Sequence, residues 1–147
     1  MNAADSYERG MQATEQLLGT RLELPMGRGE PASGLDFRKL AVAHTFGDSW
    51  TRTALDQHVR SLVSVGIAAT LGTREPLRGQ LRIAMNSQVT KDEIVDLFIH
   101  LAAYAGAARA FEGYQVALEV FAESAESAES AESAESAESA ESAESAE

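Results

Sequence analysis

One stretch, residues 59–71, constrains the fold more than any other part of the chain. It reads VRSLVSVGIAATL, and its only polar residues are Arg60, Ser61, Ser64 and Thr70. Val, Leu and Ile alternate there with Ala and Gly, so neighbouring helices can approach closely on several sides. A helix that is apolar on most of its surface is buried among other helices. The stretch therefore predicts a central helix, with Asp56 as its N-cap and Gly72 as its left-handed C-terminal residue.

The other helices are predicted from apolar residues at helical spacing and from signals at the helix ends. We expect them over residues 6–18, 33–44, 74–86, 91–105 and from about 107 onwards. Capping boxes at residues 5–8 and 90–93 are expected to open the first and fifth of the six, and Gly47 to end the second, which packs Leu40 and Ala43 inward. Because no segment alternates with period two, the predicted fold is all-α, with about six helices.

A low-complexity segment follows this domain. From residue 122 to 147 the sequence is Ala-Glu-Ser repeated to the end, so we divide the chain into a domain over 1–121 and a tail over 122–147. A three-residue repeat matches neither 3.6 nor 3.5 residues per turn, so its Glu residues would spiral round a helix without forming a stripe. We expect a solvated, flexible or partly helical extension without chemistry of its own.

Composition excludes several classes of function. Nine of the acidic residues lie in the tail, so residues 1–121 carry a formal charge of about −2 instead of the −11 of the whole chain, which gives no reason to expect nucleic-acid binding. The absence of cysteine excludes disulfides, thiolate metal sites and thiol redox chemistry. The first residues lack the order of a signal peptide, and the central apolar run is shorter than the roughly 18 residues of a membrane span. We therefore expect a cytoplasmic protein without a membrane partner.

Two histidines are candidates for proton transfer. His58 falls in the first turn of the central helix, where the positive end of the helix dipole favours the neutral imidazole, which can accept a proton. His100 shares one helix face with Asp96 and Tyr104, so a carboxylate, an imidazole and a phenol could form a hydrogen-bonded row. The alternatives are a capping or surface role for His58 and a locally satisfied boundary position for His100. His44 has no such neighbours and is predicted to be structural.

Arginine and aromatic residues near the start of the central helix are candidates for substrate binding. Arg52 and Arg60 can hold carboxylates in a bidentate fork, or equally form salt bridges at the helix end. Trp50, the single tryptophan, could line a pocket or simply pack. Three histidines without a carboxylate at ligand spacing make a metal site unexpected.

Taken together, these segments resemble the γ-carboxymuconolactone decarboxylase family, within the alkyl hydroperoxidase D-like superfamily. The resemblance extends from about Tyr7 to Phe121. It is carried by YERG at 7–10, FGDSWTR at 46–52, HVRSLVSVGIAATLG at 58–72, NSQVTKDEI at 86–94 and IHLAAYAG at 99–106.

The resemblance implies a small all-α subunit that assembles as a homo-trimer or homo-hexamer, which would cover apolar faces of the central helix. It also implies cofactor-free decarboxylation of a small anionic carboxylated lactone in aromatic catabolism. In that reaction Arg52 and Arg60 would hold the anion, His58 or His100 would protonate carbon, and Trp50 with Tyr104 would line the pocket.

The sequence also departs from the family pattern. A Glu and a His four residues apart are typical in the helix after Gly72, where this chain has Pro76 and Gln80. The Gly that is usual in the following turn is Gln88. Without cysteine the chain cannot be a thiol peroxidase like its superfamily relatives. The alternative to a decarboxylase or related carbon-acid enzyme is therefore a catalytically silent member that serves as an oligomeric binding or scaffold protein.

Overall fold

The computed structural model describes residues 2–144, and these residues form helices, turns and loops without a strand. Its elements are α1 (Ala3–Leu18), α2 (Ser33–Val42), the π-helical segment η1 (Ala43–Ser49), α3 (Gln57–Leu71), α4 (Arg74–Asn86), α5 (Lys91–Ala105) and α6 (Ala107–Glu144). The predicted all-α fold with six α-helices is therefore confirmed over the described range.

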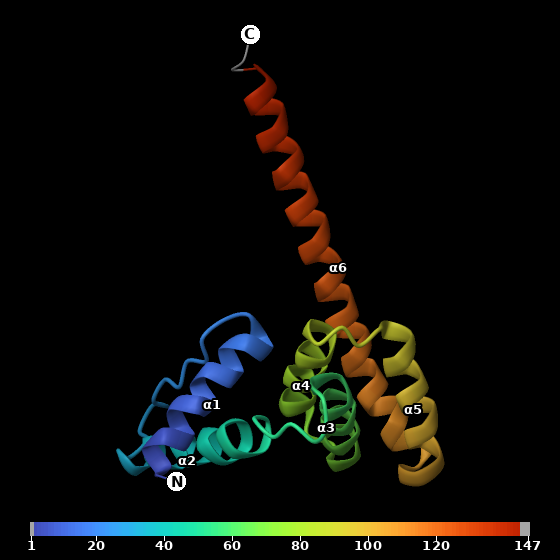
Figure 1. The fold of residues 1–147 in the computed structure, drawn as a ribbon. Helices are drawn as coiled ribbons and strands as arrows, with labels where there is room; N and C mark the ends of the chain where they lie inside the picture. Colours follow the sequence, from blue (N-terminus) through green and yellow to red (C-terminus); the bar gives the residue numbers. More distant parts are fainter. Residues whose placement is uncertain (1, 145–147) are drawn as a thin grey trace.

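The helices form two groups that lie side by side (Figure 1). α1, α2 and η1 pack on one another as an N-terminal lobe, while α3, α4, α5 and α6 form a bundle. Residues 50–56 connect the two groups. A hydrogen bond of 2.9 Å from Asn86 Nδ2 at the end of α4 to the Leu17 carbonyl oxygen in α1 ties the lobe to the bundle.

The main hydrophobic core lies inside the bundle, and α3 contacts all three of its neighbours there. Val65, Leu81 and Ile94 are completely inaccessible to solvent. The prediction of a central helix holds for one side of α3 only. Its other side carries an apolar row that is 41–68% exposed in this chain, formed by Val59, Val63, Ile67 and Leu71.

Most predicted ends of the bundle helices are confirmed. Asp56 Oδ1 accepts a hydrogen bond of 2.8 Å from the Val59 N–H, and Gly72 ends α3 in the left-handed region with φ 69°. Thr90 opens α5 with a complete capping box, and Gly106 ends it. These signals are local in sequence, which is why they could be read without knowledge of the tertiary structure.

Three predictions about the N-terminal lobe are wrong. α1 begins at Ala3, capped by the Asn2 side chain, so the expected capping box at residues 5–8 does not form. Gly47 does not end the second helix, which continues as η1 to Ser49. Leu40 is 67% exposed instead of buried, because Val42 and Ala43 are the buried residues at the junction of α2 and η1.

Close packing between helices explains the unexpected continuation past Gly47. A Cβ at Gly47 would collide with the Ser6 carbonyl oxygen in α1, and one at Gly10 would lie 2.7 Å from the Val42 carbonyl oxygen. The two glycines thus let α1 and the α2–η1 helix approach backbone to backbone. Gly47 is therefore needed for this close contact and does not end the helix.

α6 crosses the proposed boundary between residues 121 and 122 without a break and protrudes from the bundle (Figure 1). At 1.5 Å per residue, residues 122–144 extend the helix by about 35 Å. Residues 125–139 of the repeats are exposed. The division into domain and tail remains a prediction.

An ion-pair ladder joins α4 to the part of α6 where the repeats begin. Arg78 pairs with Glu119 and Glu123, Arg74 with Glu119, and Arg82 with Glu123 at 2.7 Å. The hydrogen bond from Arg74 is the main cause that lowers the pKa of Glu119, and the one from Arg82 is the main cause for Glu123. The first Ala-Glu-Ser unit therefore contacts the bundle. No helix within residues 2–144 is both long enough and apolar enough to cross a membrane.

Candidate active site between α3 and α5

α3 and α5 run beside each other and enclose a groove with a volume of about 480 Å³. From α3 it is lined mainly by Val63, Gly66, Ile67 and Thr70, and from α5 by Leu97, His100, Leu101 and Tyr104. The groove is apolar except for Thr70, the imidazole and the phenol. It is open to solvent along the exposed side of α3 described above.

His58 lies at the N-terminal end of this pair of helices and is bound to a carboxylate of α5. Its Nε2 is 2.9 Å from Glu93 Oε1, and both side chains are about one-third to two-fifths exposed. The other oxygen of Glu93 accepts hydrogen bonds from the backbone N–H and hydroxyl of Thr90, at 2.8 and 3.0 Å. One carboxylate therefore completes the capping box and orients an imidazole.

The electrostatics of this pair follow from the capping box. The pKa of Glu93 is lowered from its ordinary value, chiefly by the hydrogen bond from the Thr90 N–H and then by the one from the Thr90 hydroxyl, with a smaller effect of His58. Glu93 is therefore ionised at neutral pH and accepts from His58 Nε2–H. This arrangement fixes one tautomer of the neutral ring and leaves Nδ1 as the nitrogen that can exchange a proton.

His100 and Tyr104 lie in contact on the groove side of α5, with ring centroids 5.0 Å apart. Both are exposed, Tyr104 by 83%. The predicted row with Asp96 does not form, since no hydrogen bond connects Asp96 to either ring among the described residues. Glu93 and His100 are seven residues apart on one face of α5, or about 10 Å along the axis. His58 and His100 therefore both lie where α3 packs beside α5, but their side chains are not in contact.

His58 does not line this groove, and the remaining predicted site residues also lie outside it. Arg60 Nη2 donates to the carbonyl oxygens of Arg52 and Leu55, at 3.0 and 3.3 Å, and so stabilises the loop before α3. The Arg52 side chain is exposed. Trp50 is half-buried and stacks on Phe46 with ring centroids 6.3 Å apart. Neither Arg52 nor Trp50 lines the groove of this chain.

Sequence reasoning missed Glu93 as the partner of His58, although it recognised the capping box that contains it. The residues are 35 positions apart, and only the packing of α3 on α5 brings them together. The available signal was that a capping-box glutamate uses one oxygen for the cap and keeps the other free. His44, predicted to be structural, is exposed on the N-terminal lobe. Within residues 2–144, no three His, Asp or Glu side chains gather as a metal site would require.

Two of the three residues that depart from the family pattern lie on α4. Pro76 is exposed in its first turn. Gln80 is half-buried, and its Oε1 is inaccessible to solvent without a hydrogen-bond partner in the described part of the chain. A buried amide oxygen without a donor is costly, so this position is not optimised for the stability of the isolated chain.

Comparison with known proteins places the chain in a family. The model of the carboxymuconolactone decarboxylase family matches residues 36–119, which include α3, α4, α5 and both candidate histidines. A 4-carboxymuconolactone decarboxylase from Acinetobacter baylyi (strain ATCC 33305 / BD413 / ADP1) is 31% identical over 121 residues, covering 82% of this chain and 90% of the relative. The chain is a member of the carboxymuconolactone decarboxylase family.

Proposed function

We propose that this protein is a cofactor-free decarboxylase, or a closely related carbon-acid enzyme, acting on a small carboxylated lactone such as carboxymuconolactone. The observation that carries the proposal is the His58–Glu93 pair, which joins α3 to α5, the same two helices that form the apolar groove lined by His100 and Tyr104. Membership of the family and the similarity to a protein named 4-carboxymuconolactone decarboxylase support the substrate class.

The reaction needs charge stabilisation and one proton transfer to carbon. The bond between the carboxylate and the ring carbon breaks, carbon dioxide leaves, and the electron pair moves through the conjugated system onto the lactone carbonyl oxygen. The resulting dienolate collapses when a carbon takes a proton, which restores the carbonyl group. The substrate itself thus accepts the electrons, and the protein supplies anion binding, a dry surface and an acid.

His58 is the proposed acid, with Glu93 as the residue that positions it. An imidazolium at His58 donates from Nδ1 to carbon, while Nε2–H remains bound to the Glu93 carboxylate, as in other carboxylate–histidine pairs. His100 lies about 10 Å further along α5, where it can bind the developing oxyanion or act as the acid for the other end of the substrate. Tyr104 borders the same groove.

Arg52, Arg60 and Trp50 belong to the proposal as residues that surround the site from the loop before α3. Arg60 uses Nη2 on backbone carbonyls, which holds the loop and leaves other N–H donors of its guanidinium for a carboxylate. Arg52 is the exposed cation of this loop.

A second copy of the chain is proposed to close the groove, as a homo-trimer or homo-hexamer. Val59, Val63, Ile67 and Leu71 form an exposed apolar row whose last three residues line the groove, a surface that soluble monomers rarely expose. Covering it would exclude water from His100 and Tyr104 and would strengthen electrostatic interactions there.

The test is the rate of carbon dioxide release from carboxymuconolactone by the wild type and by the variants H58A, H100A and H44A. H44A is the matched control, because His44 is exposed on the N-terminal lobe, away from α3 and α5. We expect H58A and H100A together to abolish turnover with helicity retained in circular dichroism, and H44A to match the wild type. Full activity in both H58A and H100A would refute the assignment.

A catalytically silent scaffold is the second candidate, favoured by Pro76 and by the unpaired Oε1 of Gln80. The double variant P76E/Q80H distinguishes the two. A wild type without activity that gains turnover in this variant supports the scaffold, whereas a wild type that is already active contradicts it.

A further inference from the structure

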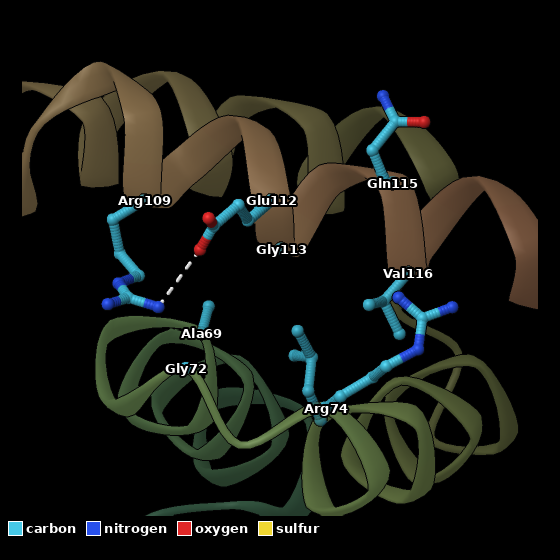
Figure 2. A pocket seen from close by; sticks show the side chains of 9 residues that line it. Ala69, Gly72, Arg74, Arg109, Glu112, Gly113, Gln115 and Val116 are labelled. Carbon is cyan, nitrogen blue, oxygen red and sulfur yellow. Dashed lines mark hydrogen bonds and ion pairs between the residues drawn. The ribbon is translucent and has the colours of Figure 1, made fainter.

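Figure 2 shows a second cavity, of about 310 Å³. Its lining residues Ala69 and Gly72 place it at the opposite end of α3 from His58. It is enclosed between the turn that joins α3 to α4 and the first half of α6. Its floor is apolar and made of the buried residues Ala69, Leu77, Gly113 and Val116. The cavity shares no residue with the α3–α5 groove, so the proposed reaction does not account for it.

Two guanidinium groups lie at the opening of this cavity, on either side of the apolar floor (Figure 2). Arg109 extends from α6 across the end of α3, where its guanidinium rests against Gly72. A Cβ at Gly72 would collide with Arg109 Nη1, so the side chain can occupy this place only because residue 72 is glycine. Arg74 is the first residue of α4 and approaches from the other side.

Each guanidinium pairs with one carboxylate and has further N–H donors that this pairing does not use. Arg109 Nη1 donates to Glu112 Oε2 at 3.0 Å, and Arg74 Nη2 pairs with Glu119. A guanidinium carries five N–H donors in a fixed fork, so these single contacts leave donors to bind another anion. Glu112 is 72% exposed and can turn away from Arg109 at little cost.

The start of α4 adds positive potential at the same place. Thr73 occupies the N-cap position without capping, because its hydroxyl donates to the Ala68 carbonyl oxygen instead. The first-turn amides of α4 therefore lack a side-chain acceptor, and the helix dipole places partial positive charge there.

We propose that this cavity binds a small ring compound that carries one or two carboxylates. The buried floor takes the ring, and Arg74 and Arg109 take the carboxylates at its edges. The volume is at the lower end of the usual range of ligand pockets, roughly 300–1,000 Å³, which limits the ligand to about one ring. No histidine lines the cavity, and its acidic lining residue is an ion-paired glutamate, so the site binds its ligand without converting it.

Such a ligand would connect the end of α3 to α6 and would stabilise the folded chain by mass action. This inference does not depend on the proposed decarboxylation, because the site, its residues and its readout are separate from those of the α3–α5 groove.

The test is calorimetric titration of the full chain with benzene-1,3-dicarboxylate and with benzoate, at low and at moderate salt. R109Q and R74Q should each weaken binding at least fivefold, and R28Q, which changes an exposed arginine in the loop before α2, should leave it unchanged. E112Q should tighten binding, because it removes the carboxylate that competes for Arg109. R28Q removes the same positive charge as R109Q and R74Q but far from the cavity, so a loss of affinity confined to R109Q and R74Q separates specific binding from a general loss of charge.

Circular dichroism of each variant shows whether it folds, and R109K provides a variant that keeps the charge if R109Q is unstable. Absence of binding to the wild type at millimolar ligand would overturn the inference. Binding that survives in both R109Q and R74Q, or that is lost in H100A and not in R109Q, would also overturn it, since the ligand would then occupy another site.

Discussion

Replacing Gln88 by glycine should stabilise the protein. Gln88 lies in the turn between α4 and α5 with φ 63°, the single left-handed non-glycine residue within residues 2–144. A residue with a Cβ loses about 1–2 kcal/mol in this conformation. Glycine avoids this cost but loses about 0.5–1 kcal/mol more chain entropy on folding. The net effect is a gain of about 0.5–1 kcal/mol, which for a chain of this size raises Tm by about 1–4 °C.

Thermal and urea unfolding followed by circular dichroism measure this gain, with Q88A as the matched control. Q88A removes the same exposed side chain but keeps the Cβ, so its stability should stay within about 0.5 kcal/mol of the wild type. Only Q88G relieves the backbone strain. If Q88G were no more stable than Q88A, strain at residue 88 would not limit the stability of this turn.

Three further substitutions test other contacts. G47A should destabilise the N-terminal lobe, because its Cβ meets the Ser6 carbonyl oxygen; a melt unchanged from the wild type would show that α1 can shift freely. L81A should cost about 2–5 kcal/mol in urea unfolding, because Leu81 is fully buried in the bundle. R74A should flatten the acid side of the stability–pH curve. The hydrogen bond from Arg74 is the main cause that lowers the pKa of Glu119 in the folded state, so the stabilisation by Glu119 is present above the ordinary glutamate pKa and is lost as pH falls through the lowered value; equal pH dependence in R74A would refute this.

The helices of the bundle could be predicted from sequence because their signals are local. The apolar spacing in α5, the caps Asp56 and Thr90 and the stop at Gly72 all act within one or two turns of the chain. Each of these was confirmed. The same reasoning failed where contacts between distant segments determine the local structure. Gly47 is the example, because its role depends on its contact with α1.

The same contrast between local signals and long-range contacts applies to the candidate site. His58 and His100 could be chosen from residue type and position, but their surroundings could not. His58 is bound to Glu93, which lies 35 residues away, and His100 faces a groove that exists only when α3 packs on α5. The direction of Arg60, towards two backbone carbonyls, likewise depends on the path of the loop before α3.

The most direct test of the central claim is kcat for carbon dioxide release from carboxymuconolactone by E93Q. Glutamine is accepted in a capping box, so this variant keeps the start of α5 while it removes the charge that orients His58. The account predicts that kcat falls at least tenfold in E93Q with an unchanged circular dichroism spectrum. An E93Q variant that turns over as fast as the wild type would contradict the claim that the His58–Glu93 pair transfers the proton.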